Sequence, residues 1–424
     1  DVYKRQEYKL TMKTPGNPSV TYDLKESNGQ LTAGQSLPLA ISRNVTENGA
    51  SQRIEITIKA NELAYYSLEE IYKLGSFGHD DCLFYMPGFW YRRNLRSPKE
   101  APSWYVSDSW QVREDRLSTP LTGIYNEKTH EYYTVLRIDK FDNESQPCHT
   151  SGEVILSGKT SLGYTGFRNV SGKSALVFGF PYSEAPKTYI RKLTLDPSVQ
   201  AFEKLDKGET RKLVWEITKG TAPDYSAFVA NVWNYSYDTY KPAAFQNAMS
   251  AAEAKNVLSN FFKESYMDKY DLKYYSGVHM RTDDCESTGS VEVGFVGRVL
   301  LNAFNALEYG ETMNRPDLVQ NAKNVFDSYL KYGFTPNGFF REFVDYSHND
   351  ETKVYSIRRQ SEGAFAILNY LEYERRKGIS HKEWDSKMVH LLDNLLKLQE
   401  ENGSFPRKFD DNFAIIDETG GSTP

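Results

Sequence analysis

The second half of the chain alternates helical segments with connections of two very different lengths, and this alternation restricts the fold more than any other feature. Apolar residues at helical spacing predict five helices, at 251–265, 291–307, 317–331, 362–376 and 382–398. The connections after the first, third and fifth helices are long and rich in carboxylates, at 266–290, 332–361 and 399–424. In an up-and-down array these three connections emerge at one end, so we expect them to share a functional face.

The predicted helices also differ in how much of their surface is apolar. The second carries only Glu292 and Arg298 as charges, and the fourth is apolar on almost every side, so both should be covered all round. The third and fifth keep their apolar residues on one stripe, which is typical of outer helices. Inner and outer helices therefore alternate, which predicts two concentric layers of helices, an α/α toroid.

The first half of the chain has the pattern of an antiparallel β-sandwich. Segments that alternate or run apolar are separated by turn residues, and they lie at 8–14, 37–45, 53–60, 132–139, 152–158, 174–180 and 211–218. We therefore expect a sandwich over 7–220, a linker over 221–250 and the first half of a toroid over 251–424. Residues 1–6 resemble a translated sequencing adapter. The chain stops where a sixth helix is expected to start, so we expect a truncated, bacterial metagenomic fragment that is inactive alone.

Composition restricts the class of partner. The net charge is −6 and the pI is near 5.8, which argues against nucleic acid, because nucleic-acid binding favours a basic surface. No apolar run approaches the roughly 20 residues of a membrane span. Three scattered cysteines and seven histidines suggest neither a metal site nor a cofactor. The chain has 30 tyrosines, 23 phenylalanines and 6 tryptophans, which suit either stacking on sugar rings or two large cores.

A large β-sandwich followed by paired helices and long acidic loops resembles the six-hairpin glycosidase clan, which includes glucoamylase-like and maltose-phosphorylase-like enzymes. The resemblance implies a glycoside hydrolase with paired carboxylates, usually inverting, with its general acid between the fifth and sixth helices and its base in the second half of the barrel. Such an enzyme is expected to be periplasmic or secreted. Toroid polysaccharide lyases usually have the opposite domain order.

The connection after the fifth helix supplies the first candidate catalytic residues, Asp417 and Glu418. They follow an apolar run, Phe413 to Ile416, and precede two glycines. A carboxyl group beside apolar side chains can keep its proton through desolvation, which a general acid requires. The alternative is that one of the two caps a sixth helix.

The first long connection contains a second acidic cluster. Asp283 and Asp284 are candidate catalytic carboxylates, and Arg281 and Glu286 are candidate substrate-binding residues, because such groups form charge-assisted hydrogen bonds with sugar hydroxyls. The acids could instead cap the second helix, and calcium binding is a weaker alternative. Glu292 is either a rim group or a paired structural acid.

The start of the fourth helix combines Arg358, Arg359 and Glu362 with the positive end of the helix. This arrangement suggests that the site holds a carboxylate or sulfate, and hence that the glycan is acidic, for example a uronide. The alternative is a structural Arg–Glu pair. Glu342 and Asp345, in the preceding connection, are interpreted as solvated loop residues.

Residues 78–98 are rich in aromatic and basic residues and too irregular for a strand. Trp90 and Tyr91 within this segment are candidate stacking residues for a sugar, and packing between domains is the alternative.

Four functions remain open from the sequence. A glycoside hydrolase is preferred. A glycoside phosphorylase would replace the base carboxylate by a phosphate site, and a polysaccharide lyase would need a Tyr or His base beside a group that neutralises a uronate. A non-catalytic glycan-binding protein would use the aromatic and arginine residues without paired acids. The sugar, the linkage and the oligomeric state stay open.

Overall fold

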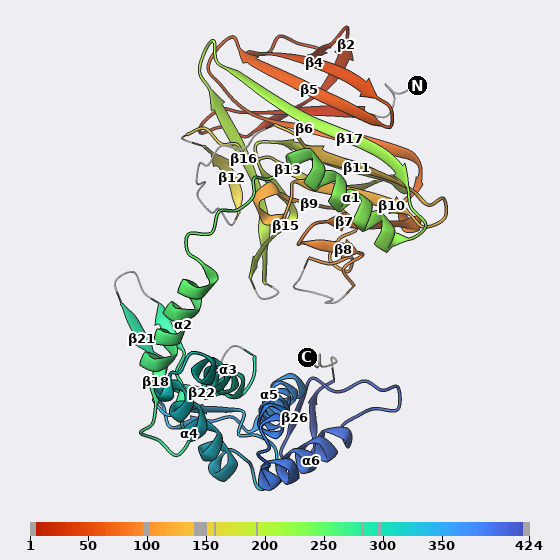
Figure 1. The fold of residues 1–424 in the computed structure, drawn as a ribbon. Coiled ribbons are helices and arrows are strands. Elements are labelled where there is room, and N and C mark those ends of the chain that lie inside the picture. Colours follow the sequence, from red (N-terminus) through yellow and green to blue (C-terminus); the bar gives the residue numbers. More distant parts are fainter. Residues whose placement is uncertain are drawn as a thin grey trace. The chain divides into compact units, whose positions relative to one another are not determined.

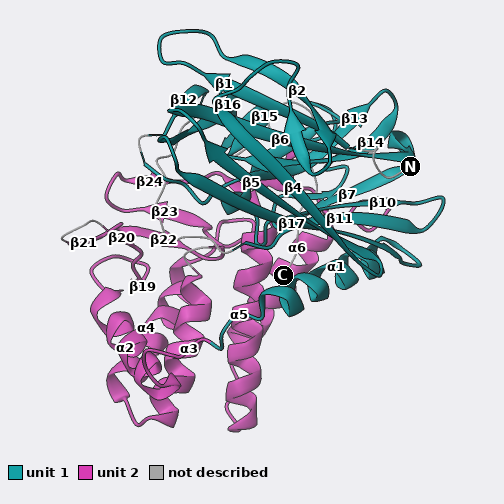
Figure 2. Ribbon diagram, turned by 90° about the horizontal axis from the view of Figure 1, so that it is seen from above, with its two compact units in different colours: residues 1–244 teal, residues 245–424 magenta. Residues whose placement is uncertain are grey.

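The structure, a computed structural model, describes residues 6–95, 102–139, 151–156, 158–191, 194–280, 284–295 and 298–418. The chain divides into two compact units, Asp1–Ala244 and Phe245–Pro424 (Figures 1 and 2). Strands dominate the first unit and helices the second, so the predicted order of β-structure followed by α-structure is confirmed. None of the described helices is long and apolar enough to cross a membrane.

Unit 1 is built mainly from antiparallel strands that pair in two runs, whereas β12 pairs with β16 in parallel. One run is β9-β13-β14-β6-β1-β2, and the other is β8-β7-β10-β11-β17-β5-β4-β3, with β16 also pairing with β6. The bounds are β1 Gln6–Lys13, β2 Val20–Ser27, β3 Gln30–Thr32, β4 Leu39–Asn48, β5 Ser51–Ala60, β6 Ala64–Gly78, β7 Cys82–Met86, β8 Trp90–Arg92, β9 Trp110–Arg113, β10 Leu121–Asn126, β11 Glu131–Arg137, β12 Gly152–Ile155, β13 Tyr164–Val170, β14 Lys173–Phe180, β15 Ser183–Arg191, β16 Thr194–Leu205 and β17 Thr210–Thr221.

The core of unit 1 follows from alternation along the strands. Ile54, Ile56 and Ile58 in β5 point to one face and are all fully buried, as a period of two requires. They belong to one apolar cluster with Phe178 of β14 and Trp215 of β17, whose rings lie 5.2 Å apart. Each of the seven predicted strand segments overlaps an observed strand.

The predicted linker contains a helix of unit 1. Helix α1, Tyr225–Tyr240, is capped by Asp224, whose side chain accepts from the Ala227 N–H at 2.8 Å. Phe228 is fully buried and stacks on Tyr125 of β10 with ring centroids 5.5 Å apart. Residues 225–240 therefore pack on the sandwich (Figure 1) instead of running free between the units.

Unit 2 contains five described helices. Their bounds are α2 Ala251–Ser265, α3 Val299–Thr312, α4 Pro316–Tyr332, α5 Ile357–Arg376 and α6 Lys382–Leu396. Helix α3 contacts both α4 and α5, α5 contacts α6, and α2 contacts α4. Direct contact between α3 and α5, with α4 and α6 packed against them, fits the predicted inner and outer pairs. The closed toroid itself stays a prediction.

Three details of the helices differ from the prediction. Helix α5, predicted over 362–376, starts at Ile357, five residues earlier. Residues 291 and 292 lie in a strand, so the second helix starts at Val299, eight residues later than expected. On α5, Phe365 and Leu368 are exposed, so the described chain does not cover this helix on every side.

The three long connections meet, as the sequence predicts. They carry short strands, namely β18 Tyr266–Met267, β19 Tyr274–Tyr275, β20 Val278–Met280, β21 Cys285–Ser287, β22 Ser290–Glu292, β23 Phe343–Asp345, β24 Asp350–Glu351, β25 Val354–Ser356, β26 Lys408–Asp410 and β27 Ile415–Asp417. Strand β22 of the first connection pairs with β23 of the second, and β25 of the second pairs with β26 of the third. Backbone hydrogen bonds therefore hold all three connections together.

Candidate functional site at the start of helix α5

Strand β25 leads directly into helix α5, and this junction places two arginines in the first helical turn. The Ser356 hydroxyl accepts from the Arg359 N–H at 3.3 Å and so caps the helix. The Ile357 N–H donates to the Arg407 carbonyl at 3.3 Å, which ties the start of the helix to the third long connection. The positive end of α5 and the side chains of Arg358 and Arg359 therefore share one fixed region.

Arg359 joins two glutamates from different connections. Its Nη2 lies 2.6 Å from the Glu292 carboxylate, and its Nη1 lies 3.1 Å from Glu342. Glu342 is buried, and it also accepts from the Ser356 N–H at 2.7 Å and from Gln360 Nε2 at 3.3 Å. Burial raises the pKa of Glu342, although these donors act in the opposite direction. The interpretation of Glu342 as a solvated loop residue was wrong.

Arg358 is more exposed than Arg359 and belongs to a second cluster. Its Nε donates to Glu362 Oε1 at 3.2 Å, and Nη2 of Arg298 lies 3.8 Å from the same oxygen. The other Glu362 oxygen accepts from the Phe295 N–H. The guanidinium of Arg358 also lies 4.8 Å from the centre of the Phe295 ring. Two guanidinium groups therefore share one carboxylate beside an aromatic ring.

The side chains of this cluster differ in exposure, and the exposed ones are those that a ligand can contact. The side chains of Arg298 and Arg358 are 48% and 42% exposed, whereas that of Glu362 is 12% exposed. The ring of Phe295 also reaches the surface. Water or a ligand therefore meets two cations and an aromatic ring, and the carboxylate of Glu362, with which both cations pair, is less exposed than they are.

The backbone at this cluster adopts a conformation that is unusual for large residues. Phe295 has φ of +61° and Arg298 has φ of +41°, both in the left-handed region. Non-glycine residues held in this region carry strain, which is found most often where a side chain has a functional position to keep.

Asp417 lies on the same small sheet as the start of α5. Asp417 of β27 is opposite Lys408 of β26, which is opposite Ser356 of β25. Two strand spacings put the Cα atoms of Asp417 and Ser356 roughly 10 Å apart. The Asp417 carboxylate lies 3.3 Å from Nη1 of Arg407.

The apolar run before Asp417 does not enclose the acids. Ile415 and Ile416 are exposed, so they do not remove water from Asp417 or Glu418 in the way that the sequence suggested. Glu418 is exposed and is the last described residue. The catalytic role of the pair stays a prediction.

The acidic cluster of the first long connection lies on a separate hairpin. Asp284 and Glu286 are exposed, at or next to the β20–β21 pairing. Arg281 and Asp283 lie outside the described residues. Glu292, by contrast, is a paired structural acid through its contact with Arg359.

The two aromatic candidates of unit 1 behave differently. Residues 82–92 form a β7–β8 hairpin, although the sequence suggested an irregular loop. Trp90 is fully buried, its Nε1 donates to the Arg92 carbonyl, and its ring packs against Trp110 and Phe167. The prediction that Trp90 stacks on a sugar was wrong, because neither ring face is accessible. Tyr91 is half exposed, and its role stays a prediction.

Sequence reasoning missed two members of the α5 cluster, Phe295 and Arg298. Arg298 was visible as one of two charges in an otherwise apolar segment, which is a signal for a rim position. Phe295 gave no signal, because an isolated phenylalanine in an apolar run is indistinguishable from a core residue.

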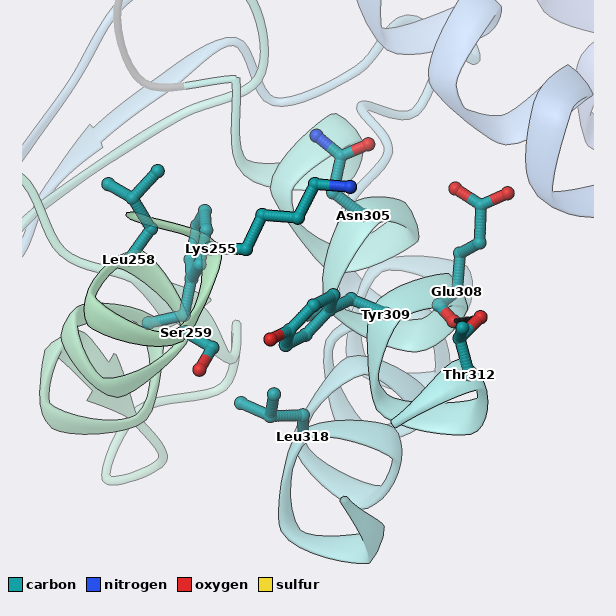
Figure 3. Close-up of a pocket in the computed structure, with 10 residues that line it drawn as sticks. Lys255, Leu258, Ser259, Asn305, Glu308, Tyr309, Thr312 and Leu318 are labelled. Atoms are coloured by element: carbon teal, nitrogen blue, oxygen red, sulfur yellow. Dashed lines mark hydrogen bonds between the residues drawn. The ribbon is translucent and has the colours of Figure 1, made fainter. Parts of the chain in front are cut away.

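A groove of about 510 Å³ lies between α2 and α3 (Figure 3). Lys255 extends from α2 toward Asn305 on α3, Tyr309 points from α3 toward α2, and Leu318 comes from α4. The described residues that line this groove include none of the predicted site residues.

Comparisons with known proteins give only distant likenesses. No family model matches the chain, and no curated protein matches it in sequence. Among solved structures, a polysaccharide lyase matches 94% of this chain and 62% of its own, at 10% identity and a TM-score of 0.41. The match to a D-mannose isomerase covers 40% of this chain and 42% of the isomerase, at 11% identity and a TM-score of 0.31. The match to a galactose mutarotase-like protein from Clostridium acetobutylicum covers 51% of this chain and 79% of that protein, at 8% identity and a TM-score of 0.25. This chain thus spans less than two thirds of the lyase, and TM-scores this low do not establish a shared fold.

Proposed function

We propose that unit 2 binds an acidic glycan at the start of α5 and that the protein is a carbohydrate-active enzyme, a glycoside hydrolase. One observation carries the proposal: the exposed guanidinium groups of Arg298 and Arg358 share a single carboxylate, that of Glu362. Around this exposed pair the guanidinium groups outnumber the carboxylates by one, whereas the adjacent Arg359 holds two carboxylates, those of Glu292 and Glu342, so the excess is confined to the exposed pair. A carboxylate on the sugar, as in a uronate, is the ligand group that this excess favours.

The neighbouring groups suit a pyranose that carries such a carboxylate. The positive end of α5 adds to the attraction for an anion. The exposed ring of Phe295 offers an apolar surface of the kind that packs against the C–H face of a sugar. Both Phe295 and Arg298 are held in left-handed backbone conformations, which supports a functional position for them.

Hydrolysis needs two carboxyl groups on either side of the scissile bond, one of which protonates the leaving oxygen. Asp417 and Glu418 are the proposed source of the acid, because β25, β26 and β27 connect Asp417 to the start of α5. Asp283 and Asp284 remain the second pair of candidates.

A polysaccharide lyase is the second candidate, and the same observation favours it. Elimination at a uronate requires that a positive group neutralise the sugar carboxylate, so that the neighbouring C–H becomes acidic enough for a base to remove. The excess of guanidinium at Arg298 and Arg358 can serve that purpose as well as it serves binding. The two reactions differ in product, because elimination leaves an unsaturated sugar that absorbs in the near ultraviolet.

The test is an assay of the protein on uronate-containing and neutral glycans, with reducing-end release and ultraviolet absorbance followed together. Arg358→Gln removes one of the two exposed guanidinium groups. Arg376→Gln, on the exposed end of the same helix, is the matched control. A uronate-selective release that Arg358→Gln weakens by about tenfold, that Arg376→Gln preserves and that Asp417→Asn abolishes supports the hydrolase.

The same assay separates the alternatives. Ultraviolet absorbance that grows with the released ends identifies a lyase. Selection of uronate over neutral glycan that is unchanged in Arg358→Gln would overturn the proposed acidic-glycan site.

A further inference from the structure

Unit 1 contains a cavity that neither the core nor the α5 site explains. Its volume is about 370 Å³. Residues from the β7–β8 turn, from the end of β9 with the turn that follows, and from β15 line it, and they are Gly88, Phe89, Arg113, Asp115, Arg116 and Tyr189. Two aromatic rings and three charged groups are therefore gathered around a space large enough for a single sugar ring.

The charged groups of this cavity are fixed in opposite pairs. Nε and Nη2 of Arg113 lie 3.0 and 2.5 Å from the two Asp115 oxygens, which is bidentate geometry. Arg116 makes the corresponding pair with Glu184, whose carboxylate is buried behind it. The two positive charges are matched by two negative charges, so this cavity, unlike the α5 cluster, has no excess of positive charge.

One donor of Arg113 has no acceptor among the described residues. The side chain of Arg113 is 8% exposed and lies over the ring of Tyr182, and its Nη1 has no hydrogen-bond partner among the described residues. A buried guanidinium N–H without an acceptor costs free energy. Nη1 is itself closed off from solvent, so it lies behind the cavity wall and does not contact a ligand directly.

The aromatic side chains form one wall. Phe89 and Tyr189 contact each other edge to face, with ring centroids 6.4 Å apart and an interplanar angle of 77°. Both are partly exposed at the cavity. Partly exposed rings beside paired donors and acceptors match the two kinds of surface that a pyranose presents, a C–H face and vicinal hydroxyls.

We propose that this cavity binds a neutral pyranose. Asp115, which is 40% exposed, accepts from sugar hydroxyls, Arg116 donates to them, and the buried Arg113 holds Asp115 in place. Balanced charge argues against an anionic ligand, because a sugar carboxylate would compete with Asp115 for Arg113 and repel it. The site lies in unit 1 and does not rest on the function proposed for α5, so either proposal can fail without the other.

The test is titration of the full chain with methyl glycosides of glucose, galactose and mannose and with methyl glucuronide, followed by saturation-transfer NMR. At least one neutral glycoside is expected to bind. Tyr189→Ala is expected to weaken its binding by about tenfold, and Tyr189→Phe, which keeps the ring, is expected to preserve it. Tyr237→Ala, on the exposed face of α1, is the matched control and is expected to have no effect.

Asp115→Asn provides a result that a merely structural role would not give. This variant leaves Arg113 without its counter-charge, so preference should move from the neutral glycoside toward the glucuronide. Absence of binding by every neutral glycoside, equal binding in Tyr189→Ala and Tyr237→Ala, or unchanged preference in Asp115→Asn would each overturn the proposal. Unfolding temperatures of all variants separate lost binding from lost folding.

Discussion

Arg358 and Arg359 are adjacent in the sequence but have different roles in the structure. Arg359 contacts Glu292 and the buried Glu342, which is the structural pair that the sequence offered as an alternative. Arg358 shares Glu362 with Arg298 and its side chain is partly exposed. The sequence could predict that arginines gather here. It could not predict which arginine would be neutralised, because that depends on Glu342, which lies in the preceding connection and pairs with Arg359.

The buried Glu342 should contribute strongly to the stability of unit 2. Glu342→Gln places an amide N–H₂ against donors from Arg359 and Ser356, which leaves buried donors poorly matched. The expected loss in the free energy of unfolding is about 1–3 kcal/mol, measured by urea denaturation. The control is Glu372→Gln on helix α5, whose half-exposed side chain should change stability by less than about 0.5 kcal/mol. Equal effects of the two variants would contradict this role for Glu342.

A second buried glutamate should make unit 1 sensitive to pH. Burial raises the pKa of Glu70 from 4.5 to about 8. The folded state therefore keeps the proton between pH 4.5 and 8, whereas the unfolded state releases it, so stability is complete below 4.5 and falls as the pH rises.

The expected slope from this one group is about 1.4 kcal/mol per pH unit over that interval. Glu70→Gln keeps the shape and cannot ionise, so its stability should be flatter with pH than that of the original protein. Parallel stability–pH curves for the two proteins, from chemical denaturation at several pH values, would show that Glu70 does not titrate as described.

At the scale of single elements, the bounds of a helix were predicted best where capping residues and the apolar periodicity indicated the same start. Helix α2 was predicted with its observed bounds, and Ser250 and Glu253 form a capping box at its start. Helix α3 was predicted to start too early. Val291 and Glu292 continue the helical pattern of the sequence, but in the structure they pair with β23. Pairing with a strand fifty residues away gives no local signal.

Helix α1 tests whether residues 225–240 belong to unit 1. Phe228→Ala removes a fully buried ring that stacks on Tyr125, so unit 1 should lose about 3–5 kcal/mol of stability. Trp233→Ala removes a larger ring from the exposed face of the same helix and should have little effect. Denaturation followed by circular dichroism measures both. A small effect of Phe228→Ala would return this segment to the predicted role of a linker.

At the scale of the whole molecule, the order of a β-rich and an α-rich unit followed from pattern and composition. The meeting of the three long connections followed from helix parity alone, and β22–β23 and β25–β26 pairing confirms it. The α5 site was half predicted: Arg358, Arg359 and Glu362 came from helix-start chemistry, whereas Phe295 and Glu342 depend on contacts between connections. The sandwich cavity was not predicted, because its lining comes from three separate segments, at 88–89, 113–116 and 189, which the sequence does not link.

The central claim is that the start of α5 recognises the carboxylate of an acidic glycan. The most direct measurement is calorimetric binding of a uronate oligosaccharide and of its carboxyl-reduced counterpart to the full chain, in original, Arg358→Gln and Arg376→Gln forms. Tighter binding of the uronate by the original protein and Arg376→Gln, weakened by salt and reduced about tenfold in Arg358→Gln, is the predicted result. Equal affinity for the two sugars, or a preference that survives Arg358→Gln, would contradict it.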